Sequence, residues 1–226
     1  MATHAVLLGV DSSPIECLSG RANSRSGAYL LGVHCLSNPD EAFYILDSRI
    51  SNMIMSLKSQ DVLVLLKLVA RRDEPWTYNS LATELDLSPS QVHAAVQRAI
   101  KSDLAYETDD QVRVHVRNLE EFLVHGMRYF FVPKKGAKSR GMATLTSAPP
   151  FAALFLDGDE PVVWPDSSGD VRGESLAPLY KSAPNAARRD PELYELLVIA
   201  DALRAGRTRE KTLATKELKK KLKNYG

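Results

Sequence analysis

The sequence is short of cysteine, of long apolar runs and of net charge. Only Cys17 and Cys35 occur among 226 residues, which is not a disulfide framework, so a reducing cytoplasm is the expected compartment. No run approaches the roughly 18 apolar residues of a membrane-spanning helix, so we expect no membrane partner. The apolar run 5–10 is too short for a secretion signal and lacks a basic flank. With 44% hydrophobic and 25% charged residues, the composition is typical of a globular protein.

The motifs of common enzyme sites are also missing. There is no phosphate-binding glycine loop and no H-E-x-x-H pair, and Cys17, His34 and Cys35 lack the spacing of a zinc site. The acidic pair Glu120/Glu121 belongs to a predicted helix start. We therefore expect no catalytic residue, no metal and no cofactor, and we expect that the chain is not an enzyme.

The net charge of +1 conceals a segregation of charge along the chain. Residues 51–130 carry nine Lys/Arg and eleven Asp/Glu, whereas residues 131–141 carry four and none, and residues 204–226 carry nine and two. The segment 132–139 is predicted to be a flexible basic loop, which either contacts a DNA backbone or is merely solvated. The candidates for that contact are Lys134, Lys135, Lys138 and Arg140. The basic helix predicted over 208–222 is interpreted as a solvated, partly frayed tail or as a non-specific nucleic-acid contact.

Residues 1–54 differ in sequence pattern from the remainder of the chain. Turn signals such as Ser12–Pro14 and Asn38–Asp40 interrupt them, and no helical period is sustained. Met53 and Met55 stand just before the first periodic segment. Two interpretations stay open: a poorly ordered N-terminal extension, or sequence upstream of a true start at one of these methionines.

From residue 56 onwards the sequence predicts three helices and a hairpin. Ser59 is the expected N-cap of a first helix that ends before Asp73, and Thr77 is the expected cap of a short helix 78–85. Ser88, Pro89 and Gln91 form a capping box with proline at the first helical position, so a third helix is predicted over 89–102. The segments 105–107 and 112–116 read as two strands around an Asp109-Asp110 turn.

This stretch resembles the helix-turn-helix of MarR-like winged-helix regulators. The residues that carry the likeness are Leu81-Ala82, the capped Leu87–Val92 segment, Ala95-Val96 and Asp103-Leu104, and it covers about residues 57–117. It implies that the third helix reads DNA in the major groove, where Gln pairs with adenine and Arg with guanine. The expected DNA-binding residues are Thr77, Ser88, Ser90, Gln91, His93, Ala94, Gln97, Arg98, Lys101 and Arg113.

Two features depart from the winged-helix pattern. The predicted wing tip, residues 108–111, is acidic where a wing that enters a groove usually offers Arg or Lys, although Arg113 and Arg117 can still touch phosphate. Asp103 stands where the common pattern has glycine. A surface helix with a polar outer face is also what any amphipathic helix shows, so the structural interpretation of the third helix stays open.

The rest of the chain predicts a mainly α fold with small β parts, an α+β class. We expect a helix over 119–129 that starts with a capping box, a small hairpin of 154–156 with 161–164, loop over most of 165–190, and a helix over 191–204 capped by Asp190. The predicted organisation is an extension over 1–54, a winged-helix domain over 55–130, and a C-terminal α+β region with a basic tail over 131–226.

The functional prediction is a sequence-specific DNA-binding transcriptional regulator. Because a palindromic operator needs two recognition helices one DNA turn apart, we expect a homodimer, with helices 119–129 and 191–204 as candidate interfaces. The alternatives are a winged-helix protein-interaction module and an antitoxin-like autorepressor that binds a partner protein. A small-molecule sensor with a pocket near Trp164 and Tyr180 is a third.

Overall fold

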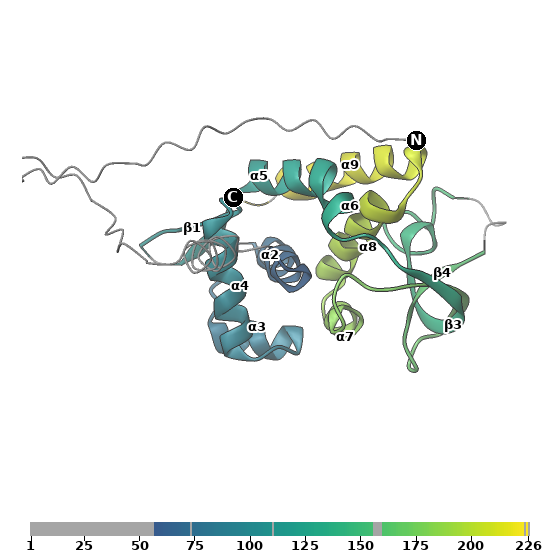
Figure 1. Cartoon of the computed structure of the whole chain (residues 1–226), viewed down its shortest axis with the longest axis horizontal. Coiled ribbons are helices and arrows are strands. Elements are labelled where there is room, and N and C mark those ends of the chain that lie inside the picture. Colours follow the sequence, from purple (N-terminus) through teal and green to yellow (C-terminus); the bar gives the residue numbers. More distant parts are fainter. Residues whose placement is uncertain (1–56, 73, 110, 156–159, 224, 226) are drawn as a thin grey trace, which may run out of the picture. The chain divides into compact units, whose positions relative to one another are not determined.

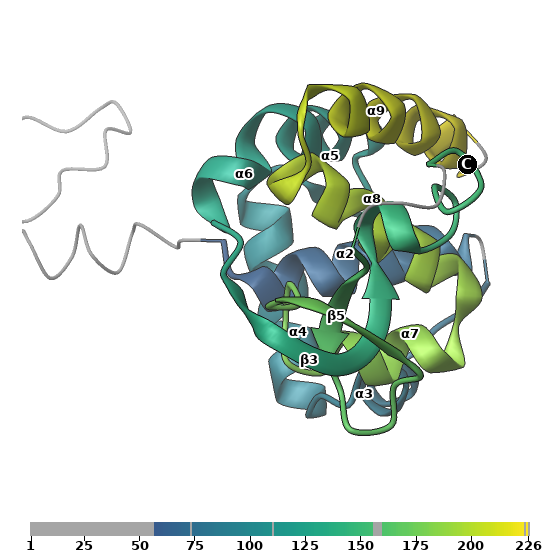
Figure 2. The ribbon, with the colours of Figure 1, turned by 90° about the vertical axis from the view of Figure 1, so that its right-hand side faces the viewer.

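The computed structural model describes residues 57–226, except residues 73, 110, 156–159, 224 and 226. The interpretations of residues 1–54 therefore lie outside the described residues. The described residues belong to one compact unit of mixed helices and strands, in agreement with the predicted α+β class (Figures 1 and 2). None of its described helices is both long and apolar enough to cross a bilayer.

The helix α2 (Ser59–Arg71) lies at the centre of the N-terminal part. Every side chain from Asp61 to Val69 is buried, so neighbouring elements surround this helix. The prediction that Ser59 is its N-cap is wrong, because Lys58 takes that position. The Asp61 carboxylate accepts the backbone N–H of Lys58 at 2.8 Å, which starts the helix one residue earlier.

The helices α3 (Tyr78–Leu85) and α4 (Pro89–Lys101) follow as the capping signals predict. Thr77 accepts the N–H of Ser80, and Ser88 accepts the N–H of Gln91 at 3.2 Å. Asp86 ends α3 in the left-handed conformation with φ of 51°, which turns the chain sharply toward α4. The predicted caps, the short second helix and the proline at the start of α4 are confirmed.

A short antiparallel hairpin follows α4. The strand β1 (Ala105–Glu107) pairs with β2 (Val112–Val114), and Asp103 before it takes a left-handed φ of 56°. The first strand is confirmed, but the second is shorter than the predicted 112–116, because α5 (Val116–Glu121) already begins at Val116.

The helical segment after the hairpin contains a π-helical turn. It consists of α5, the π-helix η1 (Phe122–Gly126) and α6 (Met127–Phe130). The capping box predicted near Asn118 is wrong, since the helix begins two residues before it. The Asn118 amide instead donates to the backbone carbonyl of Asp103 at 2.7 Å and ties α5 to the start of the hairpin.

The C-terminal part contains a small three-stranded barrel where loops were predicted. The strand β3 (Lys135–Thr144) pairs antiparallel with β4 (Val162–Pro165) and β5 (Val171–Leu176), and β4 pairs parallel with β5. The predicted loop 132–139, the predicted hairpin 154–164 and the loop over 165–190 are therefore wrong in large part. Between β3 and β4 lies the 3-10 turn η2 (Leu145–Ser147).

Glycines explain why this barrel resembled loop in the sequence. A Cβ at Gly141 would lie 1.9 Å from the carbonyl oxygen of Trp164, and a Cβ at Gly173 would lie 1.9 Å from that of Pro161. These glycines permit close approach of neighbouring backbones rather than a break in the chain.

Three helices complete the fold: α7 (Ala183–Arg189), α8 (Pro191–Ala205) and α9 (Thr208–Lys223). The predicted cap at Asp190 is confirmed, because its side chain accepts the N–H of Leu193 at 3.1 Å. Residues 196–204 of α8 are all buried, and α8 packs against α2, α7 and α9 (Figure 1). A single hydrophobic core thus joins the two halves of the described chain.

A buried polar cluster links α8 to the barrel. Asp201, with no exposed surface, accepts hydrogen bonds from Trp164 Nε1 at 2.6 Å and from Thr144 Oγ1 at 2.9 Å. Arg204 Nε also donates to Asp201, at 2.8 Å. One carboxylate therefore satisfies an indole, a hydroxyl and a guanidinium in the interior.

We predict that Asp201→Ala strongly destabilises the protein. Removing the carboxylate leaves the buried Arg204 charge and the Trp164 N–H without their acceptor, so the free energy of unfolding should fall by about 3–5 kcal/mol. Urea unfolding measures this loss. The control Asp170→Ala removes an exposed carboxylate and should change stability by no more than about 0.5 kcal/mol; equal losses in both variants would contradict the prediction.

Candidate functional site

The outward side of α4 carries a mainly polar row of residues at helical spacing. Ser90, His93 and Lys101 are exposed, and Ala94 and Gln97 are half-buried between them. The opposite side of α4 packs into the core through four buried apolar residues: Val92, Ala95, Val96 and Ala99. The predicted orientation of this helix is therefore confirmed for these five outward residues.

The start of α4 is rigidly capped, and this changes the predicted role of Gln91. Its side-chain oxygen accepts the backbone N–H of Ser88 at 2.9 Å, while the hydroxyls of Ser88 and Ser90 lie 2.9 Å apart. Because the Gln91 oxygen already serves the cap, Gln91 cannot pair bidentately with adenine unless the cap opens. In contrast, the side-chain amide of Gln97 makes no hydrogen bond with any described residue, so this amide is available.

Arg98 does not lie on the outward face, so its prediction as a guanine-reading residue is wrong. Its Nη2 and Nε donate to the two carboxylate oxygens of Asp61 at 2.6 and 2.8 Å. The Arg98 side chain is 11% exposed and that of Asp61 is 0% exposed. These hydrogen bonds raise the pKa of Arg98 above its ordinary value. The physical reason is Asp61 itself, because a carboxylate inside an apolar helix requires a cation.

An aromatic cluster fixes the ring of His93. The rings of His93 and Tyr78 have centroids 5.3 Å apart, and Tyr78 meets Trp76 edge to face, also at 5.3 Å. Partial burial, and then the negative charge of Glu107, raise the pKa of Tyr78 above its usual value. Trp76 and Tyr78 were not singled out from the sequence. Two aromatic residues at the start of a short helix do indicate, however, that a neighbouring element packs against that helix start.

The hairpin beside this cluster is acidic. A shallow cavity of about 260 Å³ lies between the start of α3 and the hairpin, and its lining includes Trp76, Tyr78, Glu107 and Asp109. The hairpin's turn is held by Thr108, whose hydroxyl donates to the carbonyl of Gln111 at 2.6 Å. Arg113 lies half-buried on β2, and Thr77 is exposed at the start of α3.

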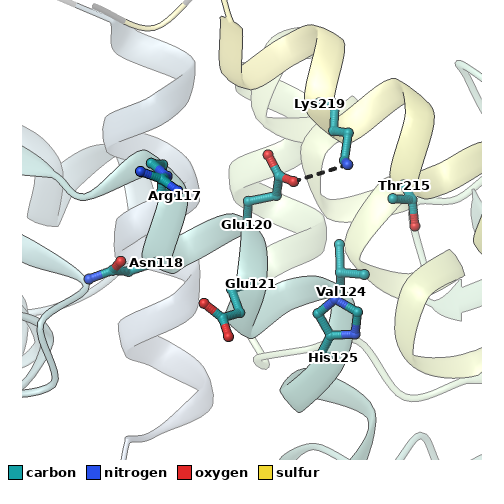
Figure 3. Close-up of a pocket in the computed structure, with 8 residues that line it drawn as sticks. All are labelled: Arg117, Asn118, Glu120, Glu121, Val124, His125, Thr215 and Lys219. Carbon is teal, nitrogen blue, oxygen red and sulfur yellow. Dashed lines mark ion pairs between the residues drawn. The ribbon is translucent and has the colours of Figure 1, made fainter.

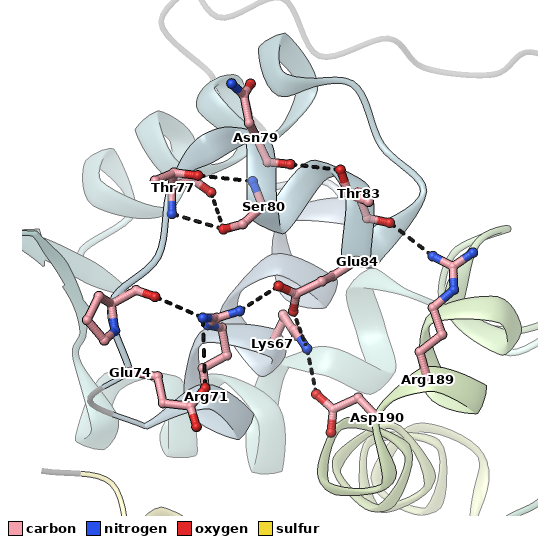
Figure 4. Close-up of polar contacts among 11 residues, drawn as sticks. Lys67, Arg71, Glu74, Thr77, Asn79, Ser80, Thr83, Glu84, Arg189 and Asp190 are labelled. Carbon is pink, nitrogen blue, oxygen red and sulfur yellow. Dashed lines mark hydrogen bonds and ion pairs between the residues drawn. The ribbon is translucent and has the colours of Figure 1, made fainter.

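A polar seam holds α3 and the turn after it against α7 and α8 (Figure 4). Lys67, largely buried in α2, pairs with Glu84 of α3 at 2.7 Å and with Asp190 at 2.6 Å. Arg189 of α7 donates to the Thr83 carbonyl and to the Asp86 carboxylate, both at 2.9 Å. The α3–turn–α4 unit is thus fixed to the C-terminal half.

Three of the four cations predicted to contact a DNA backbone lie on β3, not on a flexible loop or beside α4. Lys135 pairs with Glu174 at 3.1 Å, Lys138 pairs with Glu160 at 2.7 Å, and the Arg140 Nε donates to the carbonyl of Gly169. Lys134, next to the strand, is exposed. Because β3 and α4 lie at opposite sides of the unit (Figure 1), the two surfaces face different directions.

A groove of about 530 Å³ runs between the α5–η1 segment and α9 (Figure 3). Glu120 on one wall and Lys219 on the other form an ion pair of 3.4 Å across it. Arg117 and Glu121 give the groove a mixed charge. In the described residues, no three His, Cys, Asp or Glu side chains are grouped so that they could hold a metal ion.

No protein-family model matches the chain, and neither a curated protein nor a solved structure is similar to it.

We predict that Arg98→Ala destabilises the fold although Arg98 was expected to be a surface residue. The change leaves Asp61 charged and unpaired inside the protein, so the free energy of unfolding should fall by about 3–5 kcal/mol. The neighbouring Gln97→Ala is the matched control and should cost less than about 0.5 kcal/mol. Thermal and urea unfolding measure both; an Arg98→Ala variant as stable as the control would refute a structural role for the pair.

Proposed function

We propose that the chain is a winged-helix transcriptional regulator that reads double-stranded DNA with α4. The observation that carries the proposal is the α3–turn–α4 unit, with its left-handed Asp86, its capped Ser88 and an outward polar row on α4. The hairpin that follows α4 supplies the order of elements typical of winged helices. The MarR-like resemblance of residues 57–117 points in the same direction.

The reading residues in this proposal are those on the outward side of α4. An α-helix fits the major groove, and a free glutamine amide pairs bidentately with adenine, which makes Gln97 the main reader. His93 lies one turn before Gln97, and Lys101 lies one turn after it. Ser90 at the start of the helix and Ala94 between the readers contact the groove wall and a thymine methyl group.

Backbone contacts come from the ends of the elements around α4. Thr77 and Ser88 present capped helix N-termini, which suit a phosphate. Arg113 on β2 and the exposed Arg117 at the start of α5 are the cations nearest the hairpin in sequence. We infer that these groups fix the register of the protein on the duplex and carry no sequence information.

We also propose that the regulator works as a homodimer, through only one of the two predicted interface helices. The helix 191–204 is wrong as an interface, because α8 is buried inside the protomer. At the end of α6 the side chains of Tyr129 and Phe130 are 73% and 64% exposed, and Val132 after them is 68% exposed. This apolar end of the predicted helix 119–129 is the part that a second copy covers.

A protein-interaction module is the second candidate, and one observation favours it. Glu107 and Asp109 make the hairpin acidic, and Arg98 is withdrawn into an ion pair, so the α4 side offers little positive charge. DNA affinity depends on phosphate neutralisation, and a domain of this kind gains little of it. A basic partner protein would suit such a surface.

We predict that His93→Ala/Gln97→Ala removes sequence preference while the fold persists. The full chain is titrated with the DNA upstream of its own gene and with a scrambled duplex of the same composition. The wild type should prefer the first by about 10³-fold or more. The double variant should lose about one and a half to four orders of magnitude on that duplex, because each of the two lost base contacts contributes about 1–3 kcal/mol.

The control Ser167→Ala changes an exposed residue of the β4–β5 turn and should bind like the wild type. Equal, weak binding of the wild type to both duplexes would reject sequence reading. In that case the protein-interaction module becomes the better account.

A further inference from the structure

The last helix, α9, carries the highest positive charge of any described element. Its 16 residues hold seven Lys/Arg and two Glu. The sequence alone favours a frayed, solvated tail for such a segment, but α9 is a full helix whose residues Ala214, Leu218 and Leu222 are buried. The basic charge is therefore displayed on a fixed element and not on a loose end.

The cations of α9 gather on the side opposite the buried residues. At 100° per residue, Arg209, Lys216, Lys220 and Lys223 fall within about 60° of arc, and all four are exposed. They span about 21 Å along the helix at a rise of 1.5 Å per residue. We call these four residues the α9 basic face. A duplex presents one phosphate per about 3.4 Å of each strand, so a row of this length runs alongside several phosphates.

The α9 basic face is fixed to the rest of the protein by side chains outside it. Lys221, on the flank of the helix, pairs with Glu195 at 2.6 Å and with Glu192 at 2.8 Å, both on α8. Lys219 pairs with Glu120 of α5 across the groove shown in Figure 3. After the helix, the Tyr225 hydroxyl accepts the backbone N–H of Val114 at 3.0 Å. The C-terminal end of α9 therefore lies against the hairpin.

Little negative charge competes for the α9 basic face. Lys220 has one carboxylate, Glu217, at 3.6 Å on the same helix, and Lys216 and Lys223 form no ion pair with any described residue. An exposed pair of this kind contributes only about 0–1 kcal/mol, so a phosphate replaces it easily. On β3, by comparison, Lys135 and Lys138 both have carboxylate partners, although these pairs are exposed as well.

We infer that the α9 basic face is a second nucleic-acid contact that binds the phosphate backbone of the duplex that α4 reads. The inference rests on the proposed function and supplies what α4 lacks. Arg98 is held in an ion pair with Asp61 and the hairpin is acidic, so counterion release must come from another surface. The helix α9 is the basic element attached to the hairpin. The contact is electrostatic and independent of sequence.

The test is the salt dependence of DNA binding by the full chain. Lys216→Gln/Lys220→Gln/Lys223→Gln removes three charges from the α9 basic face. Lys134→Gln/Lys135→Gln/Lys138→Gln removes the same number at β3 and is the matched control. Both variants are titrated with the upstream duplex and with its scrambled counterpart. The salt concentration is varied from roughly 50 to 300 mM, because counterion release makes affinity fall over this range. Circular dichroism melting verifies that each variant folds.

The α9 variant should reduce the magnitude of the slope of log K against log salt by about 2.7 per protomer, or about 5.4 for the proposed homodimer, at about 0.9 for each lost phosphate contact, equally on both duplexes. The β3 control should keep the wild-type slope. An unchanged slope in the α9 variant, or equal reductions in both variants, overturns the inference. The inference also fails if the α9 variant loses binding to phosphatidylserine vesicles while its DNA slope is unchanged, because the α9 basic face would then be a membrane contact.

The two proposals fail in different ways. If His93→Ala/Gln97→Ala abolishes sequence preference but the α9 variant keeps the wild-type slope, α4 reads DNA and the α9 contact is wrong. If the wild type shows no preference but the α9 variant lowers the slope, the backbone contact stands and sequence reading by α4 is wrong.

Discussion

The ion pair between Asp61 and Arg98 is the constraint on which the rest of the site depends. Asp61 lies without exposure in the first turn of α2, and a charge in that position requires a bidentate cation from α4. The pair sets how α4 lies against α2. It also removes from the outward side of α4 the one arginine within that helix, so stability of the fold and positive charge of the outward side are in direct conflict.

The remaining polar contacts make the α3–turn–α4 unit and the C-terminal half one unit. Lys67 and Arg189 tie α3 and its turn to α7 and α8, and Asp201 ties α8 to the barrel. The helix α9 packs on α8 and so belongs to the same unit. In our proposal α4 supplies sequence reading and α9 supplies phosphate neutralisation, so the two tasks that one basic recognition helix usually performs are divided between two elements.

Local signals predicted the helices α3, α4 and α8 well, because their caps and apolar periods are short-range. Thr77, Ser88 and Asp190 cap helices as expected, and the buried side of α4 is the predicted one. The errors concern long-range partners: Arg98 was placed outward because its partner Asp61 is 37 residues away. The barrel was missed because Gly141 and Gly173, which indicate loop locally, permit close approach of strands that are distant in sequence. The same reason hid that α9 is a firmly packed helix and not a frayed tail, since its packing partners lie on α8 and α5.

The most direct test of the account is affinity cleavage of the bound duplex. With Cys17 and Cys35 replaced by serine, a DNA-cleaving iron chelate is attached at Ala94→Cys on α4 or at Lys216→Cys on α9. The account predicts cleavage within the recognised site from position 94 and cleavage of the flanking backbone from position 216. Cleavage from neither position, on DNA that the protein demonstrably binds, would contradict it.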